Sequence, residues 1–521
     1  MSAVDWAGSV LMIGTPLLYL LAALIICIQP TSVAMRISRF IVVFAGVISI
    51  AVVILRLLPT ASGATFAWLS PSIAGAVMLA LVGFIGVILQ YFSIRYLHGE
   101  PRRQHYDVTL LLTLTSVATV LISDHLLVVL LGWVAISLCL HGLLTFYPDR
   151  PRAALAAHKK FLFARVAELS LLGAFIILRI EHGTWSISEI IARYPLETLG
   201  LELHIAAVLT AIAALIKCAQ LPTHGWLMQV VEVPTPISAL LHAGIVNLGG
   251  YLLILFGPVW LQSGPAQWLI LLVASATAVI AALSMSMRVS VKVKLAWSTC
   301  AQMALMLIEC ALGLFELALL HLVAHSCYKA YSFLSAGGTP QSWRINQLAP
   351  AASPSLKAWV FSAGMAITIT SLAIALSGRF QPISPWLFMV AAITVILAEQ
   401  GSTRIRSDLA FFSLLAIAVV SLYAVLKNTA GILLGHATIT VGWGPDVWVG
   451  LLVLTLLAGH IMLRHAPNSD LSRKLAQGLY AGFYLDEWAT HTTLAIWPLR
   501  FPNRHYPTTI GQTASIKNAS S

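Results

Sequence analysis

The stretch KCAQLPTHGWLMQVVEVPTPISALLHAG, residues 217–244, contains one lysine, two histidines and three prolines within a largely apolar part of the chain. A proline inside a membrane span frees backbone carbonyl groups, which a water-lined cavity can satisfy. Pro222, Pro234 and Pro236 therefore predict a broken helix, and Lys217 lies directly before the break.

The composition around this stretch is that of a polytopic membrane protein. Hydrophobic residues make up 59% of the 521 residues and charged residues only 9%, whereas a soluble domain carries roughly a quarter charged residues. This composition excludes a soluble enzyme, a nucleic-acid-binding protein and a disordered protein. The net charge of +11 is read as a signal of membrane topology.

About 20 apolar residues are needed to cross a bilayer as a helix. Fifteen candidate spans are predicted, centred near residues 18, 48, 82, 115, 135, 171, 211, 246, 277, 303, 325, 367, 392, 417 and 455. Arginine and lysine gather in the loops after odd-numbered spans, among them a basic loop over residues 147–165. The positive-inside rule then places the N-terminus outside the cell and the C-terminus in the cytoplasm.

Ionisable residues inside spans are costly and are functional candidates for that reason. The predicted spans contain eight such residues: Glu168, Lys217, His242, Glu309, His321, His325, Lys329 and Glu399. His321, His325 and Lys329 are spaced by four, so they form one polar stripe on a helix. Imidazole and amine groups in a row can pass protons, and the alternative is a set of hydrogen bonds between helices.

Lys217 needs a counter-charge, and Glu168 is the nearest preceding acid in a span. A pair of this kind that opens and closes could move a proton, and the alternative is a static salt bridge. A second break is predicted near residues 377–385, where Ser377-Gly378-Arg379 precedes two prolines. Two interrupted segments are typical of inverted repeats with sites at mid-membrane.

No cofactor is predicted. The six cysteines lie in apolar stretches without a CxxC pair, and no nucleotide-binding glycine motif occurs. Any energy source is therefore expected to be an ion gradient, with the chemistry in another subunit.

The segment 217–244 resembles the span-seven to span-eight signature of antiporter-like subunits, which include NuoL of respiratory complex I and MrpA of sodium/proton antiporters. VKLAWSTCAQMALM (293–306) and HLVAHSCYKAYSFLSAG (321–337) are similar to the next two segments. The resemblance implies an all-α polytopic membrane protein of about 14–15 transmembrane helices, with two inverted five-helix repeats and broken helices. It also implies a proton path along the positions that match the family motifs: Glu168, Lys217, Glu232, His242, His321, His325 and Lys329.

Several positions depart from the NuoL pattern. Val134 follows Trp133 where NuoL has a glutamate, and residues 376–382 lack the span-twelve lysine. Glu168 is expected to replace the first, and Arg379 or Glu399 the second. Glu309 has no counterpart in the family.

A chain with these losses resembles the DabB family, the membrane subunits of a two-part bacterial inorganic-carbon uptake system. This implies a DabA-like, zinc-binding, carbonic-anhydrase-like partner, with protons or sodium as the driving ion. The alternatives are a proton-pumping subunit of a complex I-type oxidoreductase and a cation/proton antiporter subunit.

The expected organisation is N-terminal helices (1–105), a first repeat (106–257), a second repeat (258–407), C-terminal helices (408–465) and a cytoplasmic tail (466–521). The aromatic residues Tyr480, Phe483, Tyr484 and Trp488 recur at helical spacing, which predicts one aromatic helix face. That face is interpreted as a docking site for a partner or as a membrane-surface helix. Residues 502–521 are expected to be disordered.

Overall fold

The computed structural model describes residues 3–58, 66, 68–196, 198–339, 354–377, 383–400 and 442–498, together with single helical residues between 414 and 431. The long helices are α1 (Ala3–Ile28), α2 (Ser32–Arg56), α3 (Ile73–Tyr96), α4 (Arg103–Ile122), α5 (Leu126–Leu144), α6 (Pro151–His182), α8 (Leu201–Lys217), α13 (Gly264–Ser286), α14 (Val291–Ala311), α15 (Phe315–Leu334), α17 (Leu356–Ser377), α18 (Ser384–Gln400) and α20 (Trp443–His465). Shorter helical pieces are α7 (Ile187–Ala192), α9 (Gly225–Gln229), η1 (Val230–Glu232), α10 (Thr235–Leu240), η2 (Leu241–Ile245), α11 (Leu248–Leu255), α12 (Gly257–Trp260), η3 (Ala336–Gly338), α21 (Asp470–Ala481), η4 (Gly482–Tyr484) and α22 (Glu487–Ile496).

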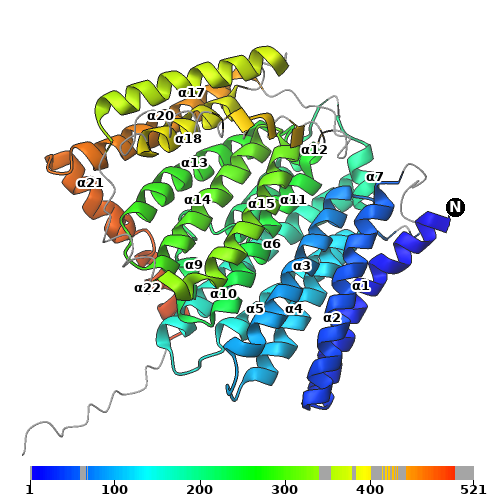
Figure 1. Cartoon of the computed structure of the whole chain (residues 1–521). Coiled ribbons are helices and arrows are strands. Elements are labelled where there is room, and N and C mark those ends of the chain that lie inside the picture. The colour runs from blue at the N-terminus through cyan, green and yellow to red at the C-terminus, as the bar shows by residue number, and fades with distance from the viewer. Residues whose placement is uncertain are drawn as a thin grey trace, which may run out of the picture.

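Most of these helices run side by side through one bundle, with α17, α18 and α20 at one end of it (Figure 1). Within the described residues, eleven helical stretches are long and apolar enough to cross a membrane. The chain is therefore a multi-pass membrane protein, and the predicted all-helical fold is confirmed. The predicted span centres lie in helices, apart from the one near residue 246, which directly follows the π turn η2.

Close packing of the N-terminal helices depends on small residues, as is usual between helices in a bilayer. A Cβ atom at Gly83 of α3 would lie 3.3 Å from the Cα atom of Gly46 on α2 and 2.5 Å from Ser49 Oγ. The hydroxyl groups of α4 meanwhile donate to carbonyl groups one turn earlier, as Thr113 does to Thr109 at 2.7 Å. These hydroxyl groups thus find acceptors within their own helix.

The basic loop predicted over residues 147–165 is wrong from residue 151 onward. Pro151 is the first residue of the 32-residue helix α6, a position that suits proline because its missing N–H has no partner there in any helix. Lys159 and Lys160 lie on this helix and are buried. A count of charges along the sequence could not separate a loop lysine from a lysine that the bundle encloses.

The single aromatic face predicted for the tail is also wrong. Helix α21 ends at Ala481; Gly482 follows with a φ of +66°, and Phe483 and Tyr484 have φ values of +50° and +55°. Three successive residues with left-handed backbones end the helix, so the aromatic residues 480–488 do not share one helix face. Residues 502–521 and Arg379, with the middle of the second predicted break, lie outside the described part of the chain.

Candidate functional site

A helix broken into five pieces passes through the middle of the bundle. After Lys217 ends α8, the chain is unwound to residue 224 and then forms α9, η1, α10, the π turn η2 and α11. The stretch Thr235–Leu255 is entirely buried. Irregular backbone is tolerated at membrane depth only where protein or a polar cavity surrounds it, and this segment meets that condition. The break predicted from the three prolines is present.

Lys217 faces a small cavity between α5, α6 and α8. The cavity has a volume of ≈ 30 Å³, which is sufficient for a water molecule. Its lining includes Trp133, Lys160, Glu168 and Lys217. The Lys217 ammonium lies 4.3 Å from the centre of the Trp133 ring, so the aromatic face supplies part of the stabilisation that water would otherwise give.

The pairing of Glu168 differs from the expectation. Its Oε1 atom accepts a hydrogen bond from Arg165 Nη2 at 2.8 Å, one turn earlier on α6. Glu168 and Lys217 do line the same cavity, but the ion pair of Glu168 is with Arg165. Glu168 therefore forms its ion pair with Arg165 while lying at the same cavity as the two lysines.

Lys160 is the member of this cavity that sequence reasoning missed. Its ammonium donates to the Ser137 carbonyl at 2.8 Å and to Ser137 Oγ at 2.9 Å. A spacing of four residues in the sequence could have indicated its position. This spacing puts Lys160, Ala164 and Glu168 on one face of α6, and all three line the cavity. Placing residues 147–165 in a loop concealed that spacing.

A second polar cluster lies on the other side of the broken helix. His242, in the π turn, shares a hydrogen bond with Thr299 Oγ1 on α14 at 3.0 Å and stacks on the Phe333 ring at 4.3 Å. Lys329 on α15 is fully buried and donates to the Leu295 carbonyl at 3.1 Å. His325 lies one turn away on α15 and is 5% exposed.

Glu309 and His321 form an ion pair that the sequence did not connect. His321 Nδ1 lies 3.0 Å from Glu309 Oε1, and His321 Nε2 lies 2.9 Å from Gln302 Oε1. The imidazole is therefore held from both ring nitrogens by side chains of α14. Glu309, for which the family pattern offered no counterpart, belongs to the same row of polar groups as His321 and His325.

The segment between residues 242 and 247 joins the two clusters. Ile245 and Val246 line the Lys217 cavity, while Asn247 donates to Ser326 Oγ on α15 at 2.6 Å. On the other side, a Cβ atom at Gly249 would lie 2.7 Å from the Ala214 carbonyl and 3.3 Å from Lys217 Cβ. Only glycine allows α11 to approach α8 this closely.

Two of the predicted site residues lie elsewhere. Glu232 is in η1, with its side chain 36% exposed and 3.7 Å from Arg152, so it is placed at the rim of the bundle. Glu399 lies in α18, and its side chain falls outside the described residues. Among the residues that the structure describes, no group of three or more histidine, cysteine, aspartate or glutamate side chains could hold a metal ion.

Comparisons with known proteins place this architecture in a family. Residues 123–373 match the model of the NADH:quinone oxidoreductase/Mrp antiporter transmembrane family. The chain is 50% identical over 442 residues to the probable inorganic carbon transporter subunit DabB of Hydrogenovibrio crunogenus, covering 84% of this chain and 85% of that protein. This chain belongs to the DabB family.

Further matches agree with the DabB assignment. The probable inorganic carbon transporter subunit DabB2 of Halothiobacillus neapolitanus is 33% identical over 81% of this chain and 79% of that protein. A structure of the Mrp complex from Dietzia has a TM-score of 0.64 at 20% identity and covers 96% of this chain. The chain spans 60% of the length of that Mrp chain, and the likeness shows that the two chains share a fold.

Proposed function

We propose that this chain conducts a cation, with the proton favoured over sodium, and that the ion gradient drives inorganic carbon accumulation by a partner subunit. The observation that carries the proposal is the pair of buried polar clusters on either side of the broken helix. Lys160 and Lys217 line the first cavity, and His242, His325 and Lys329 are buried in the second cluster. Such groups inside a bilayer mark ion pathways.

The chemistry of the two clusters favours protons. Amines and imidazoles exchange protons with water and with one another, whereas sodium is held by oxygen ligands. The oxygen-rich side chains of the clusters, Glu168 and Glu309, are already paired with Arg165 and His321. The path we propose runs through Lys160 and Lys217, past the His242 turn, and along Lys329, His325 and His321.

The carbon chemistry is proposed to take place in a DabA-like subunit that binds zinc and resembles carbonic anhydrases. Two relatives that match most of this chain are each named a subunit of a probable inorganic carbon transporter, which supports a hetero-complex. In the topology we propose, the N-terminus lies in the periplasm and the C-terminal segment in the cytoplasm, where it can reach a soluble partner.

Growth in air of cells that lack carbonic anhydrase provides the test. Expressing this chain together with its partner gene should restore growth, and either gene alone should not. A protonophore should abolish carbon uptake, and the Lys217→Ala variant of the pair should fail while still assembling. Rescue by this chain alone, or uptake that resists the protonophore, would contradict the proposal.

A second candidate function is a proton-pumping subunit of a complex I-type oxidoreductase. It is supported by the 31% identity to NADH-quinone oxidoreductase subunit L of Mycobacterium tuberculosis over 49% of this chain. Purification of the tagged chain from its native host distinguishes the two. A zinc-containing soluble subunit is expected, while quinone-reductase subunits would favour this second candidate, and several small membrane subunits with sodium-dependent growth would favour an antiporter.

A further inference from the structure

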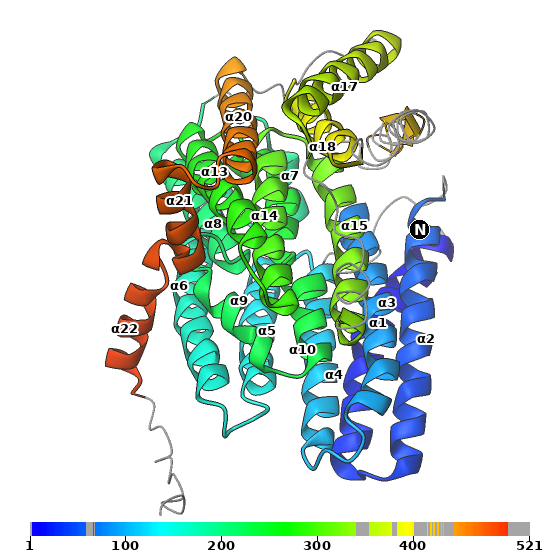
Figure 2. The ribbon, with the colours of Figure 1, turned by 60° about the vertical axis from the view of Figure 1, so that its left-hand side comes forward.

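The C-terminal segment, residues 470–497, packs along the side of the bundle. In both views α21 and α22 run down its outer flank, and α22 lies beside α6 (Figure 2). The Leu479 carbonyl accepts hydrogen bonds from Ser284 Oγ at 3.3 Å and from Arg288 Nη2 at 3.2 Å, both near the end of α13. At the far end Trp497 stacks on His158 of α6 at 3.9 Å.

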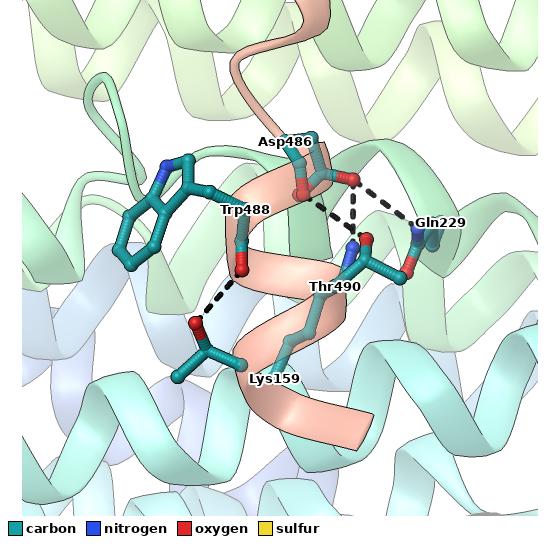
Figure 3. Close-up of polar contacts among 6 residues, drawn as sticks. Lys159, Gln229, Asp486, Trp488 and Thr490 are labelled. Carbon is teal, nitrogen blue, oxygen red and sulfur yellow. Dashed lines mark hydrogen bonds and ion pairs between the residues drawn. The ribbon is translucent and has the colours of Figure 1, made fainter. Parts of the chain in front are cut away.

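Asp486, between η4 and α22, is the polar centre of this contact (Figure 3). Its Oδ2 atom accepts a hydrogen bond from Lys159 Nζ at 2.7 Å and another from Gln229 Nε2 at 3.3 Å. The Lys159 side chain is fully buried, whereas that of Asp486 is 29% exposed. The Thr490 hydroxyl donates to the Asp486 carbonyl at 3.0 Å and fixes the first turn of α22.

The other carboxylate oxygen of Asp486 occupies the space beside Gly225, the first residue of α9. A Cβ atom at Gly225 would lie 1.5 Å from Asp486 Oδ1, so no larger residue fits while Asp486 is in place. The carboxylate thus touches both ends of the short helix α9, at Gly225 and at Gln229. This helix directly follows the unwound stretch after Lys217.

Two contacts connect this anchor to the Lys217 cavity. Trp226, next to Gly225 on α9, lines the cavity, and so does Phe163 of α6. The Phe163 ring lies 6.2 Å from the Trp488 ring of α22, edge to face. Phe163 thus contacts both the cavity and Trp488, and Trp226 directly follows Gly225, which Asp486 touches.

We propose that Asp486 is a positioning residue for ion conduction: by anchoring the C-terminal segment to α6 and α9, it keeps Trp226 and Phe163 packed over the Lys217 cavity. The inference rests on the proposed function, in which that cavity lies on the conduction path. Without the carboxylate, the buried charge of Lys159 has no counter-ion, which is costly. Lys159 and α9 then have to move, and the cavity opens to water on this side.

Thiol labelling tests directly whether Trp226 and Phe163 stay packed over the cavity. Ala167 lines the cavity and is 2% exposed, so Ala167→Cys places a reporter there in a full-length chain whose native cysteines are replaced by alanine. A water-soluble thiosulfonate reagent is applied to the chain in right-side-out and inverted vesicles. Asp486→Ala should raise the labelling rate at least about tenfold from one face, while the cysteine-free chain gives the background.

Asp470→Ala is the matched control, because Asp470 is an exposed aspartate of the same C-terminal segment, with an 84% exposed side chain that pairs with Arg473. It should leave the labelling rate unchanged. Asp486→Asn keeps one acceptor for Lys159 and Gln229, so it should give a smaller increase. Gln229→Ala breaks the contact from the α9 side and remains informative if Asp486→Ala does not fold.

Labelling needs no transport, so its outcome is independent of which ion or partner the chain serves. A parental labelling rate in folded Asp486→Ala and Gln229→Ala chains would overturn the proposal. Increased labelling together with failure of the growth test would uphold the positioning role and refute the proposed function alone.

Discussion

Replacing Lys160 by methionine tests whether ion conduction needs both buried amines, Lys160 and Lys217. The variant removes two charge-assisted hydrogen bonds to Ser137, at 2.8 and 2.9 Å, each of which contributes about 1.5–3 kcal/mol. It also removes the desolvation cost of a buried ammonium, which is several kcal/mol. Methionine has a similar length and suits an apolar site.

These two contributions oppose one another, so the free energy of unfolding should change by less than about 2 kcal/mol. Conduction should fall at least about tenfold, equivalent to about 1.4 kcal/mol in the barrier, because one of the two amines of the cavity is lost. The assay is proton flux into proteoliposomes, reported by a pH-sensitive dye, with thermal unfolding of the purified chain measured in parallel.

Lys160→Arg separates a relay from a structural role. Arginine keeps the donors for Ser137 but does not release its proton in the working range, so this variant should fold and conduct as poorly as Lys160→Met. Flux at the parental rate in either variant would show that Lys160 only supports the packing of α5 against α6, and the proposed path would then begin at Lys217.

Four further predictions concern single sites. Lys217→Ala and Lys217→Arg should both abolish flux in a chain that still inserts, since neither side chain exchanges a proton. Glu168→Gln should reduce flux, because Glu168 lines the same cavity as the two lysines; flux at the parental rate would show that this carboxylate takes no part in the path. Glu309→Gln should reduce flux about as much as His321→Leu, because each breaks the same ion pair at 3.0 Å. Full activity of the His321 variant would show that the pair has only a structural role. Burial raises the pKa of Asp124, in the turn between α4 and α5, although hydrogen bonds from two serines lower it. A folded-state pKa above the unfolded value means that the folded state binds this proton more tightly, so the contribution of Asp124 to stability falls as the pH rises through that interval. Thermal unfolding of Asp124→Asn between pH 4 and 7 should therefore lack this part of the pH dependence.

Much of the fold could be predicted from the sequence because the bilayer imposes a local rule. A helix that crosses it needs about 20 apolar residues, and all the predicted span centres but the one near residue 246 lie in helices. Prolines identified the break after Lys217, since their effect on a helix is also local. The prediction was wrong at the start of α6 and for the aromatic residues 480–488. At both places the need to cross the bilayer does not decide the structure.

The candidate site could be predicted only in part. Lys217, His242, His325 and Lys329 stand out because a charge or imidazole inside an apolar stretch must face protein. Lys160 did not stand out, because a lysine ten residues from a helix start is the same in sequence whether it faces water or a cavity. The pairing of Glu168 with Arg165 could have been found, since the two are three residues apart on one helix.

The sequence by itself determined that this chain crosses the membrane many times, where the helix beside Lys217 is broken, and which ionisable groups must lie inside. Those properties follow from hydrophobicity and backbone chemistry, which act residue by residue along the chain. Only the tertiary structure decided which groups meet. Glu309 reached His321, and Asp486 reached Lys159 across 327 residues, because such contacts depend on how separate helices pack, and no local pattern records that packing.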